Sequence, residues 1–155
     1  MSRTAIVLTA AATAAVALGS AAPAIADPGD AQTVRRIACE QYAVGASTFD
    51  YRDLRSWQQR LKQGVSPELS AKYDHTVGAM NQVLQPLQWV STGRFAGAET
   101  QDLGNGVWRA KCFINVHATN TQAPQGRTTT TQYVITLDKN RGWLITDVGG
   151  DPAGQ

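Results

Sequence analysis

The residues of this 155-residue chain that are best suited to covalent chemistry are its two cysteines, Cys39 and Cys112. In an oxidising compartment their thiols would form a disulfide, and the long loop that it closes would add about 4 kcal/mol to the free energy of unfolding. The alternative is two buried thiols that pack as small apolar side chains. A catalytic thiolate needs a neighbouring base, and neither cysteine has a histidine close in sequence. We therefore predict a Cys39–Cys112 disulfide in an exported chain.

The remaining candidates for chemistry do not assemble into a catalytic or metal-binding motif. His75 and His117 are the only histidines, and they do not stand at metal-ligand spacing with each other or with the cysteines. The nearest approach to a hydrolase nucleophile elbow, around Ser47, lacks the final glycine. No glycine-rich loop precedes a helix in a way that would bind phosphate. The sequence thus predicts no catalytic residue, no metal and no cofactor.

Large aromatic residues are spread along the chain, and they have two interpretations. Most would build the core of a small domain, and some would instead line a ligand cavity, because pockets are mostly apolar with a few polar groups. The candidate cavity residues are Tyr42, Trp57, Trp89, Tyr133 and Asp147. If Asp147 were buried beside Tyr133 or Tyr42, it would be the acid–base residue of an isomerase or dehydratase. The sequence leaves the burial of Asp147 open.

Three helices are predicted ahead of the strands. Apolar or small residues recur every three or four positions across residues 30–48, which indicates a first amphipathic helix. A second, shorter helix begins near Leu54 and ends at Gly64, a typical C-terminal cap residue. Ser66 followed by proline is a strong signal for the start of a third helix, which Pro86 ends.

Four strands follow the helices. The segments 107–118, 130–138 and 143–148 have the composition of antiparallel strands, and residues 87–98 indicate a bent or bulged strand before them. The sequence therefore predicts an α+β domain in which three N-terminal helices pack on one face of a curved four-stranded antiparallel sheet. Such an arrangement forms a cone.

The strand at residues 107–118 alternates between a buried and an outer face. The face expected to be buried comprises Trp108, Ala110, Cys112, Ile114, Val116 and Ala118. On the outer face, Phe113, Val134 and Leu144 would form an apolar patch beside Arg109 and Lys111. Single exposed apolar residues need no function. An aromatic residue flanked by basic ones is also the composition of an interface centre, so we predict that a partner binds this face rather than the loops.

The N-terminus has the pattern of a cleavable signal peptide. Arg3 precedes an apolar stretch, and Ala24-Ile25-Ala26 is an A-x-A cleavage site, so we expect residues 1–26 to be removed. A retained membrane anchor is the alternative. Residues 27–150 would then form a single α+β domain, and residues 151–155 a frayed tail. The formal net charge of +2 gives no basic field for nucleic acid.

Three segments of the sequence resemble one family. Residues 46–54 (ASTFDYRDL), residues 66–69 (SPEL) with Tyr73 one turn on, and residues 142–148 (GWLITDV) look like segments of the actinobacterial Mce (mammalian cell entry) associated proteins. The resemblance covers nearly all of the chain after residue 26. It implies a nuclear transport factor 2-like or cystatin-like cone, and an envelope protein that assists or stabilises lipid or sterol transporters. That family offers no catalytic residues.

Taken together, these features predict an exported, non-enzymatic accessory domain of the cell envelope. It would be secreted or periplasmic and would act through an envelope protein partner, such as an Mce transporter component. A secreted carrier of a small molecule or lipid ligand is one alternative, and a cone-fold isomerase or dehydratase is another. A packed interior favours the accessory domain, whereas a large apolar cavity favours the carrier or, with a buried Asp147, the enzyme.

Overall fold

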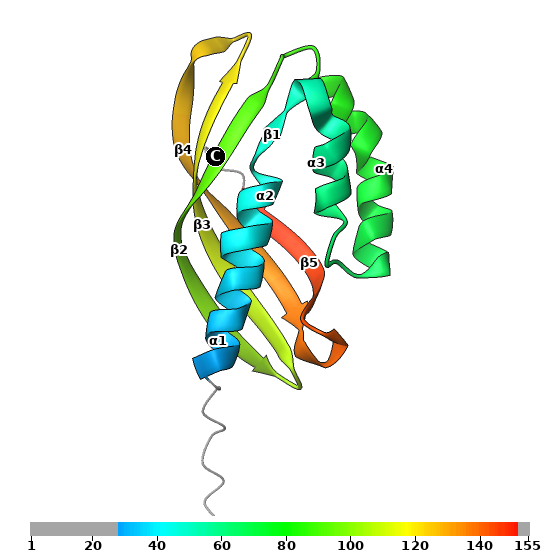
Figure 1. The fold of residues 1–155 in the computed structure, drawn as a ribbon, viewed down its shortest axis with the longest axis vertical. Helices are drawn as coiled ribbons and strands as arrows, with labels where there is room; N and C mark the ends of the chain where they lie inside the picture. Colours follow the sequence, from blue (N-terminus) through cyan, green and yellow to red (C-terminus); the bar gives the residue numbers. More distant parts are fainter. Residues whose placement is uncertain (1–27, 152–155) are drawn as a thin grey trace, which may run out of the picture.

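The computed structural model describes residues 28–151, which form helices packed on one face of a curved antiparallel sheet (Figure 1). In chain order the elements are α1 (Pro28–Val34), η1 (Arg35–Ala43), α2 (Val44–Ala46), β1 (Phe49–Asp50), η2 (Tyr51–Asp53), α3 (Leu54–Leu61), α4 (Pro67–Leu84), β2 (Val90–Gly104), β3 (Val107–Asn120), β4 (Ala123–Asp138), η3 (Lys139–Arg141) and β5 (Leu144–Asp151). The predicted α+β fold is confirmed, with five strands in the order β1-β2-β3-β4-β5 instead of four. The additional strand, β1, has two residues, too few to leave an alternating pattern in the sequence.

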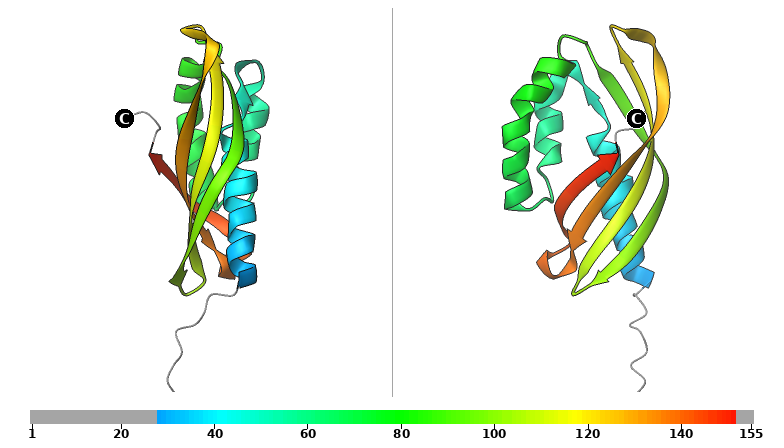
Figure 2. Two further views of the ribbon diagram at one scale, coloured as in Figure 1. Left: turned by 90° about the vertical axis from the view of Figure 1, so that its left-hand side faces the viewer. Right: turned by 180° about the vertical axis from the view of Figure 1, so that it is seen from behind.

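The first three helical elements follow one another as a single rod, residues 28–46, that crosses the sheet. In Figure 1 this N-terminal rod passes in front of the strands, and in the view from behind the strands pass in front of it (Figure 2). The helices α3 and α4 form a hairpin beside the rod. Within residues 28–151, the rod and this hairpin therefore lie on the same face of the sheet, and the opposite face is left to the strands.

The middle of the rod, η1, is wound as a π-helix. Val34, Ala38, Cys39 and Tyr42 are buried against the sheet, which agrees with the apolar stripe in the sequence. Because the turn of a π-helix is closed by bonds five residues apart, side chains at that spacing become neighbours. Arg35 and Glu40 accordingly form an ion pair, with Nε 3.1 Å from Oε1.

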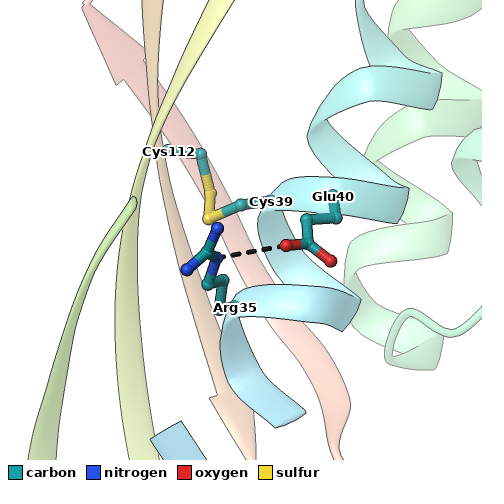
Figure 3. Close-up of a disulfide and its surroundings, with 4 residues drawn as sticks. All are labelled: Arg35, Cys39, Glu40 and Cys112. Atoms are coloured by element: carbon teal, nitrogen blue, oxygen red, sulfur yellow. Dashed lines mark ion pairs between the residues drawn. A yellow bond between two sulfur atoms is a disulfide. The ribbon is translucent and has the colours of Figure 1, made fainter. Parts of the chain in front are cut away.

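A disulfide between Cys39 and Cys112 ties the rod to β3 (Figure 3). Both cysteines are fully buried, and their Cα atoms lie 5.1 Å apart across 73 residues of sequence. The disulfide expected from the sequence is therefore formed in the structure. Figure 3 shows the Arg35–Glu40 pair beside it, and the Arg35 guanidinium lies over the Phe95 ring at 4.9 Å from its centroid.

The two helices of the α3–α4 hairpin begin where the sequence indicated, whereas α3 ends at Leu61 with Lys62 as its C-cap, before the predicted cap Gly64. The Asp53 side chain accepts a hydrogen bond from the Ser56 N–H at the start of α3, and the Ser66 side chain accepts one from the Leu69 N–H at the start of α4. Gly64 takes a left-handed backbone conformation, with φ +70°, after α3. The turn between the two helices also joins the edge of the sheet, where Val65 pairs with Ile145 in β5.

The alternation predicted for residues 107–118 holds in β3 as far as Ile114, while Val116 and Ala118 of the predicted buried face are half-buried. Trp108, Ala110, Cys112 and Ile114 are buried against the helices, whereas Arg109 is exposed. The core continues into β4 and β5 through Ile135, Leu137 and Ile145. The sheet therefore has one apolar face under the helices and one mixed outer face.

The predicted signal peptide, residues 1–26, lies outside the described residues, as do residues 152–155 of the predicted tail. Asp151, placed in that tail by the sequence analysis, ends β5 instead. Among the helices of residues 28–151, none is long and apolar enough to span a bilayer.

Candidate functional site

A groove opens where the rod, the end of α3 and the β4–β5 turn meet. Its volume is about 430 Å³ and its wall is mainly apolar. We call it the rod groove, and its residues are Ile37, Gln41, Tyr42, Gly45, Ala46, Arg60, Leu61, Gln63, Gly64, Gly142, Trp143, Leu144 and Ile145. Its walls are joined by main-chain bonds, because the Ser66 N–H donates to the Ile145 carbonyl at 2.7 Å and the Ile145 N–H donates to the Gly64 carbonyl at 2.9 Å.

Three glycines line the rod groove. A Cβ atom added to Gly45, Gly64 or Gly142 would have no heavy atom within 4 Å beyond its chain neighbours and, at Gly45, the backbone of its own helix. Gly64 and Gly142 adopt positive φ in turns, a backbone conformation that glycine takes without steric cost. Gly45 differs because it lies in a helical segment without positive φ, where glycine costs about 1 kcal/mol relative to alanine.

Trp143 bounds the groove in a conformation that is unusual for a large residue. Its φ of +61° lies in the left-handed region, where backbone strain is on the order of 1–3 kcal/mol. The indole meets Trp108 edge-on at 6.4 Å between centroids, and Lys139 Nζ lies 5.8 Å from its centroid. Lys139 also pairs with Asp30 of α1 at 2.6 Å. These contacts offset the strain and hold the half-buried ring at the groove.

Arg60 supplies the charge of the rod groove. Its Nη2 donates to the Thr48 carbonyl at 3.0 Å, while the side chain is otherwise exposed. No ion pair within residues 28–151 involves Arg60, and no carboxylate lines the groove. Hydrogen bonds from Ser56 are the main cause that lowers the pKa of Asp53, and the charge of Arg60 contributes to that shift. Among the residues that line the groove, Arg60 therefore supplies the one charge, and the Asp53 carboxylate lies near enough to interact with it.

Two hydrogen-bonded tyrosines lie behind the groove wall. The Tyr42 hydroxyl donates to the Leu61 carbonyl at 2.7 Å and shares a hydrogen bond with the Tyr73 hydroxyl at 2.9 Å. Leu61 ends α3, so this bond satisfies one of the carbonyls that a helix end leaves unpaired. Burial is the main cause that raises the pKa of Tyr42, Tyr73 and Tyr133 above the usual phenol value. At neutral pH these phenols are uncharged hydrogen-bonding groups.

Replacing Tyr42 with phenylalanine is expected to lower the free energy of unfolding by about 1–3 kcal/mol, because the buried Leu61 carbonyl loses its partner. Tyr73→Phe is the control, since it leaves the Tyr42–Leu61 bond in place and should cost about 0.5–1.5 kcal/mol. Urea unfolding of both variants checks this. Equal losses would show that the Leu61 carbonyl does not depend on Tyr42.

Part of the predicted cavity set comes together around Tyr73. The electrostatic influence of Tyr73 contributes to the raised pKa values of Tyr42 and Tyr133, so the three phenols are neighbours. Asp147 is exposed, although its charge adds to the burial effect that raises the pKa of Tyr73. The buried carboxylate that the isomerase alternative requires is therefore not formed at Asp147.

The two tryptophans of the predicted cavity set lie elsewhere. Trp57 is a buried core residue, its ring 4.8 Å from that of Phe49 and its Nε1–H donating to the Ala46 carbonyl at 3.0 Å. Trp89 is half-buried just after α4, where its N–H donates to the Leu84 carbonyl. Neither belongs to the residues that line the rod groove.

On the outer face of the sheet, the structure brings Phe113 and Val134 close together. β3 pairs with β4 so that Phe113 is opposite Gln132 and Lys111 is opposite Val134. Phe113 and Val134 are therefore diagonal neighbours, and both are half-buried. Arg109, two residues before Lys111 on β3, is exposed.

Leu144 does not join this pair. It lies opposite Asp138, four residues along β4 from Val134, and it contributes to the rod groove. The predicted three-residue apolar patch therefore reduces to Phe113 and Val134. The register of β5 against β4, including an irregularity next to Thr136, decides this position, and the sequence pattern did not reveal it.

Sequence reasoning missed the rod groove as a site. Gly45, Arg60 and Trp143 come from three distant segments, and only the fold brings them together. One signal was present, because a glycine inside a helical pattern often has a packing or functional reason. Within residues 28–151, no cluster of three or more His, Cys, Asp or Glu is arranged to hold a metal ion.

These elements define a cone-shaped α+β domain of the nuclear transport factor 2-like class. No protein-family model and no curated protein matches the chain. Solved structures do match it. An IcmL-like type IV secretion system protein from Legionella pneumophila superposes with a TM-score of 0.59 at 15% identity, covering 75% of this chain and 88% of that one.

Two further solved structures share the fold. CagV, a VirB8 homologue of the type IV secretion system of Helicobacter pylori, matches with a TM-score of 0.57 at 14% identity over 79% of this chain and 99% of its own. The periplasmic domain of DotI matches with a TM-score of 0.51 at 16% identity, covering 74% of this chain and 90% of that domain. At these identities the likeness shows a shared fold.

These matches overturn the resemblance to Mce-associated proteins, because the structural neighbours are type IV secretion proteins. The lipid-transport function and the Mce transporter partner were inferred from that resemblance, and both are therefore wrong as well. The structure supplies a local reason for the misleading segment. Asp50 accepts a hydrogen bond from the Arg52 N–H and Asp53 accepts one from the Ser56 N–H, so the Phe49–Leu54 run encodes a turn and a helix start.

Proposed function

We propose that this chain is an exported, non-enzymatic component of a type IV secretion-like envelope assembly and that it acts through contacts with other proteins. The observation that carries the proposal is the match of its fold to 88–99% of the solved IcmL-like and CagV chains. The matched domain of DotI and a matched fragment of TraM are periplasmic, which supports the envelope as the location of this chain. Residues 1–26 would direct export and be removed, leaving residues 27–150 as the working domain.

The outer face of the sheet is the proposed contact with the envelope partner. The helices α1 to α4 pack on the opposite face, so no helix of residues 28–151 covers this one (Figures 1 and 2). Its centre is the diagonal pair Phe113 and Val134, with Arg109 and Lys111 beside it. An aromatic centre with a charged surround suits a protein interface.

Photo-cross-linking in the native cells tests the proposed function. A photoreactive phenylalanine analogue at Phe113 is expected to capture a type IV secretion component, identified by mass spectrometry. Val83, an exposed apolar residue of α4 at 54% relative exposure, is the matched control position and should not capture it. Capture of a component of a different envelope system, or equal capture from Val83, would reject the proposal.

The double variant Phe113→Asp with Val134→Lys tests the proposed surface. Co-purification of the partner should fall sharply while the fold is retained, because both side chains lie on the outer face. Val83→Asp is the control and should leave co-purification unchanged. If the double variant unfolds, or if it binds like the wild type, this face is not the contact surface.

A further inference from the structure

The π-helical part of the rod is centred on the disulfide. The π winding spans nine residues, Arg35–Ala43, and Cys39 is the middle one. An α-helix precedes it, and after it the Ser47 N–H donates to the Ala43 carbonyl four residues back at 3.1 Å. Most π-helices are single turns inside α-helices, so a segment of this length is uncommon. Its arginine, alanine, glutamate and glutamine residues are good α-helix formers, so the winding needs a cause outside the helix.

The winding decides whether Cys39 faces the sheet. Among the buried residues of the rod, Val34, Ala38 and Tyr42 are spaced four apart, which an α-helix also places on one face. Cys39 lies five residues after Val34, and at about 3.6 residues per turn that spacing would point its side chain about 140° away from Val34. Cys39 and Ala43 are therefore the buried rod residues that need the wider turn, and Ala43 contributes a single methyl group. The disulfide is covalent, so it is the contact that excludes the α winding.

We propose that the Cys39–Cys112 disulfide is a conformational lock on the rod. While the bond is present, the rod is wound as a π-helix from Arg35 to Ala43, and when a dithiol reduces the bond, this segment rewinds as an α-helix. In that reaction the S–S bond of the protein breaks and each cysteine sulfur takes a proton, while the two thiols of the reductant form a disulfide. The lock acts within this chain and needs no partner.

The contacts at the two ends of the rod give the rewinding a direction. At the C-terminal end, the buried Ser91 hydroxyl donates to the Ser47 carbonyl at 2.6 Å. Towards the N-terminal end, the exposed Arg35 guanidinium lies over the half-buried Phe95 ring at 4.9 Å from its centroid. An exposed cation–π contact is weaker than a buried hydrogen bond whose loss leaves a polar group unpaired. We therefore expect Arg35 to leave the Phe95 ring on reduction, while the Ser47 end stays in place.

The ion pair of Glu40 reports which winding is present. In the π-helix Glu40 pairs with Arg35, five residues before it. In an α-helix the neighbouring residues are three and four apart, so Glu40 would pair with Arg36 instead. Both arginines are exposed, and the exchange between them is a readout of geometry that does not depend on the stability of the fold.

Hydrogen-bond scalar couplings in the 15N,13C-labelled protein test the lock, because they identify the carbonyl to which each amide of the π segment is bonded. In the oxidised protein these carbonyls should be five residues back. After reduction with dithiothreitol in urea and refolding in its presence, they should be four residues back. Nuclear Overhauser contacts of Glu40 should then move from Arg35 to Arg36, and those between Arg35 and Phe95 should be lost. Carbonyls four residues back in the oxidised protein, or five back in the folded reduced protein, would overturn the proposal.

Moving the disulfide by one residue decides the matter if the reduced protein does not fold. Ala38→Cys with Cys39→Ala retains a covalent link to Cys112 but attaches it at a buried position that both windings turn to the sheet. This oxidised variant should show carbonyls four residues back, and persistence of the π winding would contradict the lock. Ala43→Gly is the matched control, because it deletes the other side chain that needs the wider turn and keeps the native bond. It should remain π-helical, and an α-helical rod in this variant would assign the winding to packing instead.

Discussion

Replacing Cys39 and Cys112 together with alanine is expected to lower the free energy of unfolding by about 4 kcal/mol. The disulfide joins residues separated by 73 positions, and constraining so long a loop removes much conformational entropy from the unfolded chain. Both cysteines are fully buried between the rod and β3, so the loss of two sulfur atoms also leaves a small void. Apart from the main chain, the disulfide is the covalent link between the helices and the sheet within residues 28–151.

Urea unfolding of the wild type, the reduced wild type and the double alanine variant measures this effect. The dependence of the unfolding free energy on urea should also steepen without the disulfide, because the unfolded chain then exposes more surface. The reduced wild type separates the contribution of the bond from that of the void. A loss of less than about 1 kcal/mol would mean that packing alone fixes the rod on the sheet.

The features that the sequence could predict are local ones. Ser66 followed by proline marks the start of α4 because the serine side chain and the proline ring act within one helical turn. The alternation from Trp108 to Ile114 predicts the buried face of β3 because every second residue of a strand points to the same side. The disulfide followed from the apolar faces of the two cysteines and an oxidising compartment.

The features that the sequence could not predict depend on contacts between distant segments. The rod groove combines Gly45, Arg60 and Trp143, whose approach requires the α3–α4 turn to pair with β5. The position of Leu144 depends on the register of the sheet edge. The family resemblance failed for a related reason, since local turn and helix-start chemistry can recur in chains of different function.

Gly93→Ala is expected to destabilise the protein by about 3 kcal/mol, at the upper end for overpacking one methyl group. A Cβ atom at Gly93 would overlap Ser47 Oγ and lie 3.0 Å from Ile114 Cγ2. Ser47 cannot move away easily, because it is buried, its Oγ donates to the Ala43 carbonyl at 2.8 Å, and its carbonyl accepts from Ser91 Oγ at 2.6 Å. The substitution therefore pushes the end of the rod away from β2.

A second substitution separates this collision from a general weakness of β2. Ser47→Gly removes both Ser47 atoms that the new methyl group would meet, at a cost of about 1 kcal/mol for the lost hydrogen bond. Independent effects would add to about 4 kcal/mol, whereas relief of the overlap should make the double variant more stable than Gly93→Ala alone. Gly97→Ala is the control on the same strand, since its Cβ would lie 3.8 Å from Phe113 in ordinary contact. Thermal and urea unfolding of the four proteins completes the cycle, and strict additivity would show that Gly93 is required for a reason other than Ser47.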